Sequence, residues 1–249
     1  MNPYLFDLII VLLTYLYIFI TILIPVQLKK REKISKFQAR KIVHLFAGLS
    51  VFSSPFYAWK WWPVIIAGTL TILVLLSSKK SKVKQLKEIY DSIGEEAEEK
   101  VGYLQGPFHY CLSLAGLITF FVIVAPNQLY FPIAGILLMI VSDTIASIIG
   151  KRYGRINIRI PWIKSTRTLE GSLSFFGSGF ILCFIVFTFL GVTNPLTQIQ
   201  ISIGFALMIS LITSALATVV ELISPSTWDD LTVPILTTLI IFLLTYYIK

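Results

Sequence analysis

The sequence predicts an all-α integral membrane protein, a bundle of about eight transmembrane helices with both termini on the extracytoplasmic side. The first observation is composition: of 249 residues, 56% are hydrophobic and 14% are charged, whereas soluble domains carry about 25% charged residues. The second is a mean hydropathy of +0.81. The third is a series of apolar stretches, each close to the roughly 20 residues that cross a bilayer as a helix.

The apolar stretches set the order of the expected helices. They lie at residues 4–28, 42–58, 61–78, 107–125, 129–149, 170–191, 198–220 and 232–248. The turn between the short second and third stretches is rich in aromatic residues, as is typical of a membrane interface. All Lys and Arg residues except Lys60 and Lys249 follow the first, third or fifth stretch. Because basic loops favour the cytoplasm, this pattern predicts that those three loops are cytoplasmic.

We expect one polytopic membrane domain over residues 1–249. Residues 79–106 form a cytoplasmic charged connector, basic and then acidic, which predicts a solvated helix or hairpin at the membrane surface. Residues 150–170 form a second basic cytoplasmic segment. The connections at 126–132 and 192–200 carry no charge, so we expect any chemistry at the cytoplasmic face.

Asp143 lies near the end of an apolar stretch, where a carboxylate costs about 2.5 kcal/mol or more. Steps of three and four residues place it on a small, polar helix face. The residues of that face are Asp143, Ala146, Ser147, Gly150 and Gly154. Such a face admits a ligand or another helix close to the backbone. The alternative to a functional site is helix packing, with Asp143 paired to Lys151 or Arg152.

A basic segment leads into the sixth stretch. Lys164 and Arg167 come just before Thr168, which we expect to cap a helix that begins near Leu169. Exposed amides at a helix N-terminus beside basic side chains favour an anion. We therefore expect phosphate binding here, although helix packing alone would explain the small residues that follow.

An acidic cluster separates the last two stretches. Glu221, Asp229 and Asp230 lie in a segment without a basic residue. Oxygen ligands of this kind favour Mg²⁺ or a similar hard cation, and a solvated acidic loop is the alternative. Carboxylates, bases and an apolar environment together are what phosphoryl transfer to a lipid requires. The chain has neither GxxxxGK[ST] nor GxGxxG, so a P-loop enzyme and a soluble-type kinase are not indicated.

Four motifs resemble those of the membrane-embedded, CTP-dependent lipid-alcohol kinases, the family of dolichol kinase, phytol kinase and the yeast-type diacylglycerol kinase. They are ARKIVHLFAG, SDTIASIIGKRYG, TRTLEGS and ELISPSTWDDLTVP, in the family's order. The matching positions are Arg40, Lys41, His44, Asp143, Ala146, Gly150, Gly154, Glu170, Gly171, Ser172, Glu221, Asp229, Leu231, Val233 and Pro234. Two positions depart from the family pattern, with Arg167 where Lys is usual and Asp230 where Asn is usual.

The resemblance implies transfer of the γ-phosphate of CTP to a long-chain isoprenoid alcohol (polyprenol, geranylgeraniol, phytol or dolichol), with Mg²⁺, at the cytoplasmic face of a prokaryotic cell membrane or a eukaryotic endomembrane. It implies catalytic roles for Asp143, Glu170 and His44, the last as a base for the alcohol. Asp143 with Glu221 or Asp229 would hold the metal. The residues implied to bind the nucleotide and its phosphates lie in or beside the loop at 150–170, except for Lys41 of the first motif: Lys41, Ser147, Gly150, Lys151, Arg152, Gly154, Lys164, Arg167, Gly171 and Ser172.

Other functions fit parts of this pattern. A cytidylyltransferase that makes a CDP-lipid from a lipid phosphate would use the same nucleotide and metal. A lipid transporter or flippase would place polar residues through the bilayer midplane, whereas here they gather at one face. A purely structural membrane subunit would not need the four motifs. No nucleic-acid partner is expected; the expected partners are CTP, the alcohol and membrane lipids.

Overall fold

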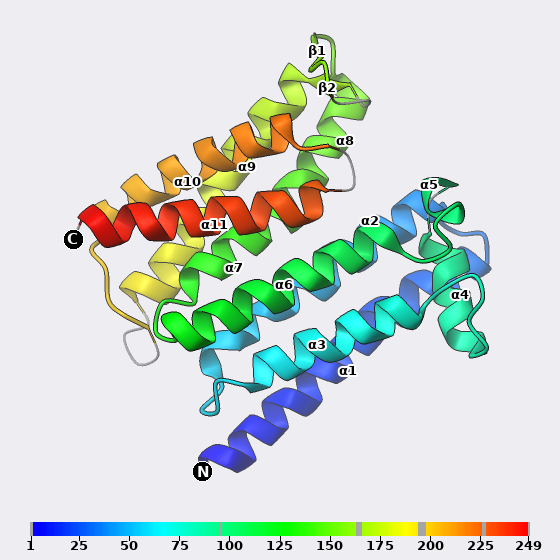
Figure 1. The fold of residues 1–249 in the computed structure, drawn as a ribbon, viewed down its shortest axis with the longest axis horizontal. Helices are drawn as coiled ribbons and strands as arrows, with labels where there is room; N and C mark the ends of the chain where they lie inside the picture. Colours follow the sequence, from blue (N-terminus) through cyan, green and yellow to red (C-terminus); the bar gives the residue numbers. More distant parts are fainter. Residues whose placement is uncertain (1, 95, 163–165, 194–197, 226–227, 249) are drawn as a thin grey trace. The chain divides into compact units, whose positions relative to one another are not determined.

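The computed structural model describes residues 2–94, 96–162, 166–193, 198–225 and 228–248 (Figure 1). This part of the chain is almost entirely helical, so the predicted all-α class is confirmed. The chain divides into two compact units, which we call unit 1 (Met1–Gly116) and unit 2 (Leu117–Lys249). Each unit is described by itself, and the prediction of a single membrane domain stays a prediction.

Within the described residues, six helical stretches are long and apolar enough to cross a membrane, which fits a multi-pass membrane protein. They are Pro3–Lys30, Gln105–Val124, Tyr130–Tyr153, Leu169–Val192, Ile203–Ile223 and Asp229–Tyr246. The stretch predicted at 61–78 is a shorter apolar helix, Trp62–Leu76. The stretch predicted at 42–58 falls on an α-helix that continues as a 3₁₀ segment. Eight crossings and the side of the termini therefore stay predictions.

Unit 1 is built from a long first helix and shorter helices that pack along it. Its elements are α1 (Pro3–Lys30), α2 (Lys36–Gly48), the 3₁₀ segment η1 (Leu49–Phe56), α3 (Trp62–Leu76), α4 (Lys84–Ile93), α5 (Glu96–Glu99) and the first part of α6 (Gln105–Val124). Asn2 caps α1 by accepting from the Tyr4 amide at 3.0 Å. Ser35 and Gln38 form a capping box at the start of α2.

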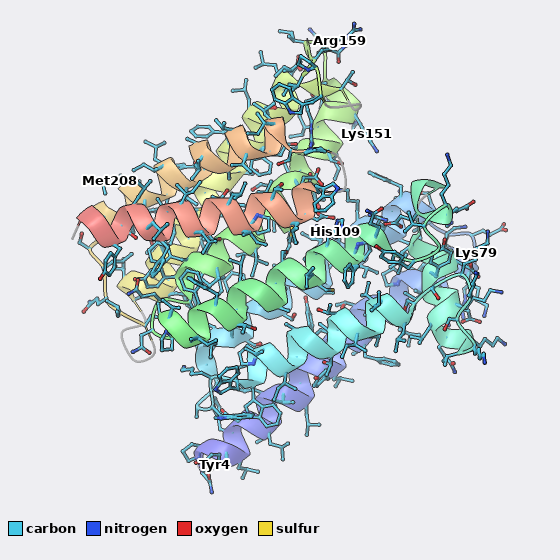
Figure 2. The ribbon with its side chains drawn as sticks, viewed as in Figure 1. Tyr4, Lys79, His109, Lys151, Arg159 and Met208 are labelled. Atoms are coloured by element: carbon cyan, nitrogen blue, oxygen red, sulfur yellow. The ribbon has the colours of Figure 1, made fainter. Side chains whose placement is uncertain are left out.

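The charged connector is attached to the C-terminal end of α1 and to α2. Lys30 lies 3.2 Å from Glu88 of α4. Arg40 lies 2.9 Å from Glu98, whose carboxylate also accepts from the Gly106 amide. Glu98 is 1% exposed, so the acidic part of the connector is not simply solvated. The loops after α1 and α3 thus meet at one end of unit 1, where Figure 2 shows Lys79.

The other end of unit 1 is held by a buried carboxylate. Asp7 is fully buried and accepts hydrogen bonds from the amides of Ala58 and Trp59, each at 2.8 Å. In the same place Thr14 and Tyr57 share a hydrogen bond of 3.0 Å. Asp7 therefore fastens the turn between η1 and α3 to the first turns of α1.

Unit 2 is a bundle of membrane helices with a short β-ribbon at one end. After the second part of α6 come α7 (Tyr130–Leu137), the π-helical turn η2 (Leu138–Ser142), α8 (Asp143–Tyr153), β1 (Asn157–Ile158), β2 (Arg167–Thr168), α9 (Leu169–Val186), the π-helical turn η3 (Phe187–Val192), α10 (Ile203–Ile223) and α11 (Asp229–Ile248). The strands pair antiparallel, Asn157 with Thr168 and Ile158 with Arg167. Helix α9 packs against both α8 and α10, and α11 packs against α7 and α10.

The end of unit 2 opposite the ribbon is closed and apolar. Aromatic rings contact one another there, those of Phe121, Tyr130, Phe131, Phe187 and Phe242. The two connections predicted to share a side meet at this end. The Ile199 amide donates to the Asn127 carbonyl at 2.7 Å, and the Leu129 amide donates to the buried Gln198 side chain at 2.6 Å.

Replacing Asp7 should destabilise unit 1. Asp7→Ala removes both acceptors and leaves two amides unpaired, so we expect a loss of about 2–4 kcal/mol. Thermal unfolding of the purified protein in detergent measures it. Asn2→Ala, which removes an exposed cap on the same helix, is the matched control and should cost about 1 kcal/mol or less. Equal unfolding temperatures for the two variants would contradict the assigned role of Asp7.

Candidate active site

A polar cavity of about 450 Å³ lies at the ribbon end of unit 2. It lies among α8, the β-ribbon and the N-terminal part of α9, with Glu221 of α10 at its side. Figure 2 shows Lys151 of α8 and Arg159 of the following loop at this end. The residues that line the cavity are Asp143, Ala146, Ser147, Gly150, Lys151, Gly154, Asn157, Thr166, Arg167, Thr168, Gly171, Ser172 and Glu221.

The small helix face read from the sequence forms one wall of this cavity, and it is also a packing surface. A side chain at Gly150 would lie 2.9 Å from the Thr168 hydroxyl, and one at Gly154 would lie 2.6 Å from the Thr168 methyl group. A side chain at Gly171 would lie 3.2 Å from the Ala146 carbonyl oxygen. The glycines therefore let α8 approach α9, and the cavity opens beside that contact. The face from Asp143 to Gly154 therefore both packs against α9 and lines the cavity, so helix packing and a ligand site do not exclude each other.

Asp143 follows directly on a π-helical turn. The turn η2 covers Leu138–Ser142, and α8 begins at Asp143. A π turn inserts one extra residue into a helix and is frequent at functional sites. Because of the extra residue, the face that begins at Asp143 is rotated about the helix axis relative to the buried surface of α7. The sequence contains no proline or glycine in this turn, so the break was not predictable from it.

Arg167 connects the ribbon to two helix ends. Its guanidinium forms a short ion pair with Glu221 near the end of α10 and lies 3.1 Å from the carboxylate of Asp229 at the start of α11. It also donates to the Ser224 carbonyl at 3.5 Å. The Glu221 side chain is 5% exposed and that of Arg167 is 17% exposed. A planar guanidinium can serve several oxygens at once, which a lysine ammonium does less well.

The charge of Arg167 is secured by its surroundings. Burial by itself lowers the pKa of Arg167, but the carboxylates of Glu221, Asp229 and Asp143 outweigh it and raise the pKa above its ordinary value. Its Nε atom is buried without a hydrogen-bond acceptor among the described residues. Arg167 therefore keeps its positive charge. Carboxylates hold its guanidinium, and the residue also lines the cavity.

The start of α9 is capped by the protein itself. Thr168 accepts from the Gly171 amide at 3.2 Å, which confirms the predicted cap and the helix start at Leu169. The Leu169 amide donates to the Ile156 carbonyl at 2.9 Å. The Glu170 carboxylate accepts from the amides of Arg155 and Ile156 at 3.0 and 3.3 Å. Two of the amides expected to bind an anion therefore already have partners, and Glu170 holds the loop after α8.

The acidic residues converge, but two of them bind Arg167. Asp143, Glu221, Asp229 and Asp230 line a small void of about 10 Å³. Among the described residues, no group of three or more His, Cys, Asp or Glu side chains is arranged to hold a metal ion. Oxygen donors of this type suit Mg²⁺, which is bound mostly through one or two carboxylates together with waters and substrate phosphates. Asp143 lines the cavity and is a carboxylate of this kind, and Glu221 and Asp229 are ion-paired with Arg167.

The remaining predicted residues lie in several places. Arg152 is not among the described residues that line the cavity, and its guanidinium lies 5.3 Å from the ring centre of Tyr153. Lys164 lies outside the described residues. Lys41 and His44 are on α2 of unit 1, where the His44 ring lies 4.8 Å from that of Tyr110. Their roles, like those of the other predicted site residues, stay predictions.

Two cavity residues were not expected from the sequence. Asn157 and Thr166 line the cavity because the β-ribbon brings them over the start of α9. Asn157 lies outside the four motifs, and Thr166 begins TRTLEGS at a position that was given no role. Only the pairing of β1 with β2 reveals them.

Arg167 should be essential to the stability of unit 2. Arg167→Met removes the partner of the buried Glu221, and an uncompensated buried charge costs about 3–5 kcal/mol. Thermal unfolding in detergent measures this loss. Arg159→Met, an exposed position in the same segment, is the control and should leave the unfolding temperature unchanged. The double variant Arg167→Met/Glu221→Met should regain much of the loss, and no regain would show that the ion pair is not its cause.

Comparison with known proteins finds relatives over most of the chain. It is 28% identical to "Probable phytol kinase 2, chloroplastic" of Glycine max over 225 residues, 88% of this chain and 69% of that protein. It is 28% identical to "Probable phytol kinase, chloroplastic" of Zea mays over 229 residues, 88% of this chain and 70% of that protein. A segment of 63 residues is 43% identical to the dolichol kinase of Saccharomyces cerevisiae, 24% of this chain and 11% of that protein.

No family model and no solved structure matches the chain significantly. The relatives are nevertheless proteins named as kinases of two lipid alcohols, and two of them span most of the chain. The resemblance to the membrane lipid-alcohol kinases, first indicated by the four motifs, is thereby confirmed.

Proposed function

We propose that the chain is a kinase that transfers the γ-phosphate of CTP to a long-chain isoprenoid alcohol at the membrane surface. The relatives, which are named as kinases of phytol and dolichol, support a kinase that acts on a lipid alcohol. The observation that carries the finer proposal is the cavity at the ribbon end of unit 2, where Asp143, Lys151 and Arg167 line one polar space. Catalysis of phosphoryl transfer consists mostly of positioning and charge stabilisation, and these residues supply both.

The phosphates are expected to bind on the basic side of the cavity. Lys151 is exposed and lines it, so its ammonium lies where a phosphate would bind. Arg167 is fixed in orientation by Glu221 and Asp229, which lowers the entropy lost on binding a phosphate. Glu170 keeps the loop after α8 in place through two backbone amides and acts as a positioning residue.

Asp143 is the carboxylate that we propose to hold Mg²⁺, together with the phosphates of the nucleotide. When bound, the ion would neutralise charge on those phosphates. Glu221 or Asp229 could serve as a second ligand only after release of Arg167. His44 remains the proposed base for the alcohol, because a hydroxyl nucleophile needs a proton acceptor. We propose that the active site faces the cytoplasm, as the distribution of basic residues predicts.

The donor and the acceptor are tested together by labelled transfer. The purified protein in detergent is incubated with Mg²⁺, geranylgeraniol or phytol, and γ-labelled CTP or ATP in parallel tubes. We expect label in the lipid phase from CTP and not from ATP. Label from α-labelled CTP with a lipid phosphate, and none from the γ-label, would instead support a cytidylyltransferase. Equal label from CTP and ATP would refute the CTP preference.

Asp143→Asn should abolish transfer while the protein stays folded. The amide keeps the size of the side chain and loses its charge, so we expect kcat/KM to fall by roughly 10²-fold or more. The measurement is the same assay, with thermal unfolding in parallel. Asp91→Asn, an exposed carboxylate on α4, is the control and should retain full activity. Near-normal turnover of Asp143→Asn would remove Asp143 from the catalytic group.

A further inference from the structure

Unit 1 contains a cavity of its own, which the proposed kinase chemistry does not use. It is a groove of about 520 Å³ between α1, α3 and α4, a size within the range of ligand sites, roughly 300–1,000 Å³. Its walls are mainly apolar, with Ile22, Leu23 and Val26 on α1, Leu70 and Leu73 on α3, and Leu86 on α4. Figure 1 shows α3 beside α1 and α4 near the C-terminal end of α1.

A polar pair lies at each end of the groove. At one end the hydroxyl groups of Tyr15 and Thr69 lie 2.7 Å apart and bridge α1 to α3. At the other end Lys30 lies 3.2 Å from Glu88, bridging α1 to α4. The lining residues of α1 run from Tyr15 to Gln27, a distance of about 18 Å along a helix. One leaflet of a bilayer has a hydrocarbon depth of about 15 Å, so the groove is about one leaflet deep.

Basic residues lie next in sequence to the residues that line the α4 end of the groove. Helix α4 contributes two apolar residues to the groove, Leu86 and Ile89, and two polar ones, Gln85 and Glu88. The last turn of α1 and the first turns of α4 carry four lysines, which we call the lysine rim: Lys29, Lys30, Lys84 and Lys87. Glu88 compensates one of these charges, so the lysine rim keeps an excess of positive charge.

We propose that this groove binds one acyl chain of an anionic phospholipid, with the headgroup at the lysine rim. A chain one leaflet long fills the apolar walls up to the Tyr15–Thr69 bridge, where a polar pair stops it. Basic residues at a membrane surface attract anionic lipid headgroups. A zwitterionic lipid lacks that net charge, and a neutral alcohol would leave the lysine rim without a counter-ion. The proposal rests on unit 1 alone and is independent of the proposed kinase activity.

Lipid retention tests the proposal directly. The purified full-length chain, freed of bound lipid in a neutral detergent, is mixed with equal amounts of phosphatidylglycerol and phosphatidylcholine of the same acyl chains. Native mass spectrometry then counts the lipid molecules that remain bound. We expect one phosphatidylglycerol per chain, preferred over phosphatidylcholine by roughly tenfold.

Two pairs of variants separate the groove from general solvation by lipid. Leu23→Trp fills the groove and should lose the bound lipid, whereas Ile24→Trp, the exposed neighbour on α1 that does not line the groove, should keep it. Lys29→Gln/Lys30→Gln should reduce the preference for the anionic lipid severalfold. Lys80→Gln/Lys100→Gln removes the same charge from exposed positions beside the Ser78–Tyr103 bridge of unit 1 and should not. The lysine variants keep the test decisive if Leu23→Trp fails to fold.

Three results would overturn the proposal. Equal retention of the two phospholipids would show that lipid merely solvates the groove, without selection of an anionic headgroup. Unchanged retention by Leu23→Trp and by the Lys29→Gln/Lys30→Gln variant would place the bound lipid elsewhere. Displacement of phosphatidylglycerol by an equal amount of geranylgeraniol would identify the groove as an alcohol site. Loss of kinase activity is not a readout here, so failure of the proposed function leaves this test unaffected.

Discussion

The ion pair between Arg167 and Glu221 is the interaction on which the candidate site depends. It joins the β-ribbon to the end of α10, and the same guanidinium reaches Asp229 at the start of α11. The ribbon and the facing ends of two consecutive helices, more than 50 residues further along the chain, are thus fixed around one buried charge. Burying two opposite charges is favourable only when their geometry and remaining hydrogen bonds are good. The Ser224 carbonyl supplies one of those bonds, and the cavity forms beside this junction.

Close helix packing gives the site its shape. Without side chains at Gly150, Gly154 and Gly171, α8 and the ribbon approach α9 until Thr168 lies between them. The Thr168 hydroxyl caps α9 at the same position. Residues that serve packing and residues that line the cavity are therefore the same residues. A substitution there changes both, so activity loss in a glycine variant would not by itself identify a ligand contact.

The sequence predicted the parts of this protein that depend on local pattern. Apolar runs gave the membrane helices, the three-and-four spacing gave the face from Asp143 to Gly154, and Thr168 was a recognisable cap. It did not predict interactions between distant residues. Glu98 was expected in a solvated segment, but Arg40 buries it. It also did not predict that Arg167 lies between Glu221 and Asp229, because only the fold of the ribbon brings Arg167 to them.

The closed end of unit 2 bears on how the protein can move. Gln198 and Ile199 join one interhelical connection to Leu129 and Asn127 of another, the first through its side chain and the second through its backbone amide, near packed aromatic rings. Alternating access requires a bundle to open at each end in turn. Opening this end would break those bonds in an apolar surrounding, where each unpaired group is costly. These contacts favour movement at the ribbon end of unit 2 over an opening of its two ends in turn.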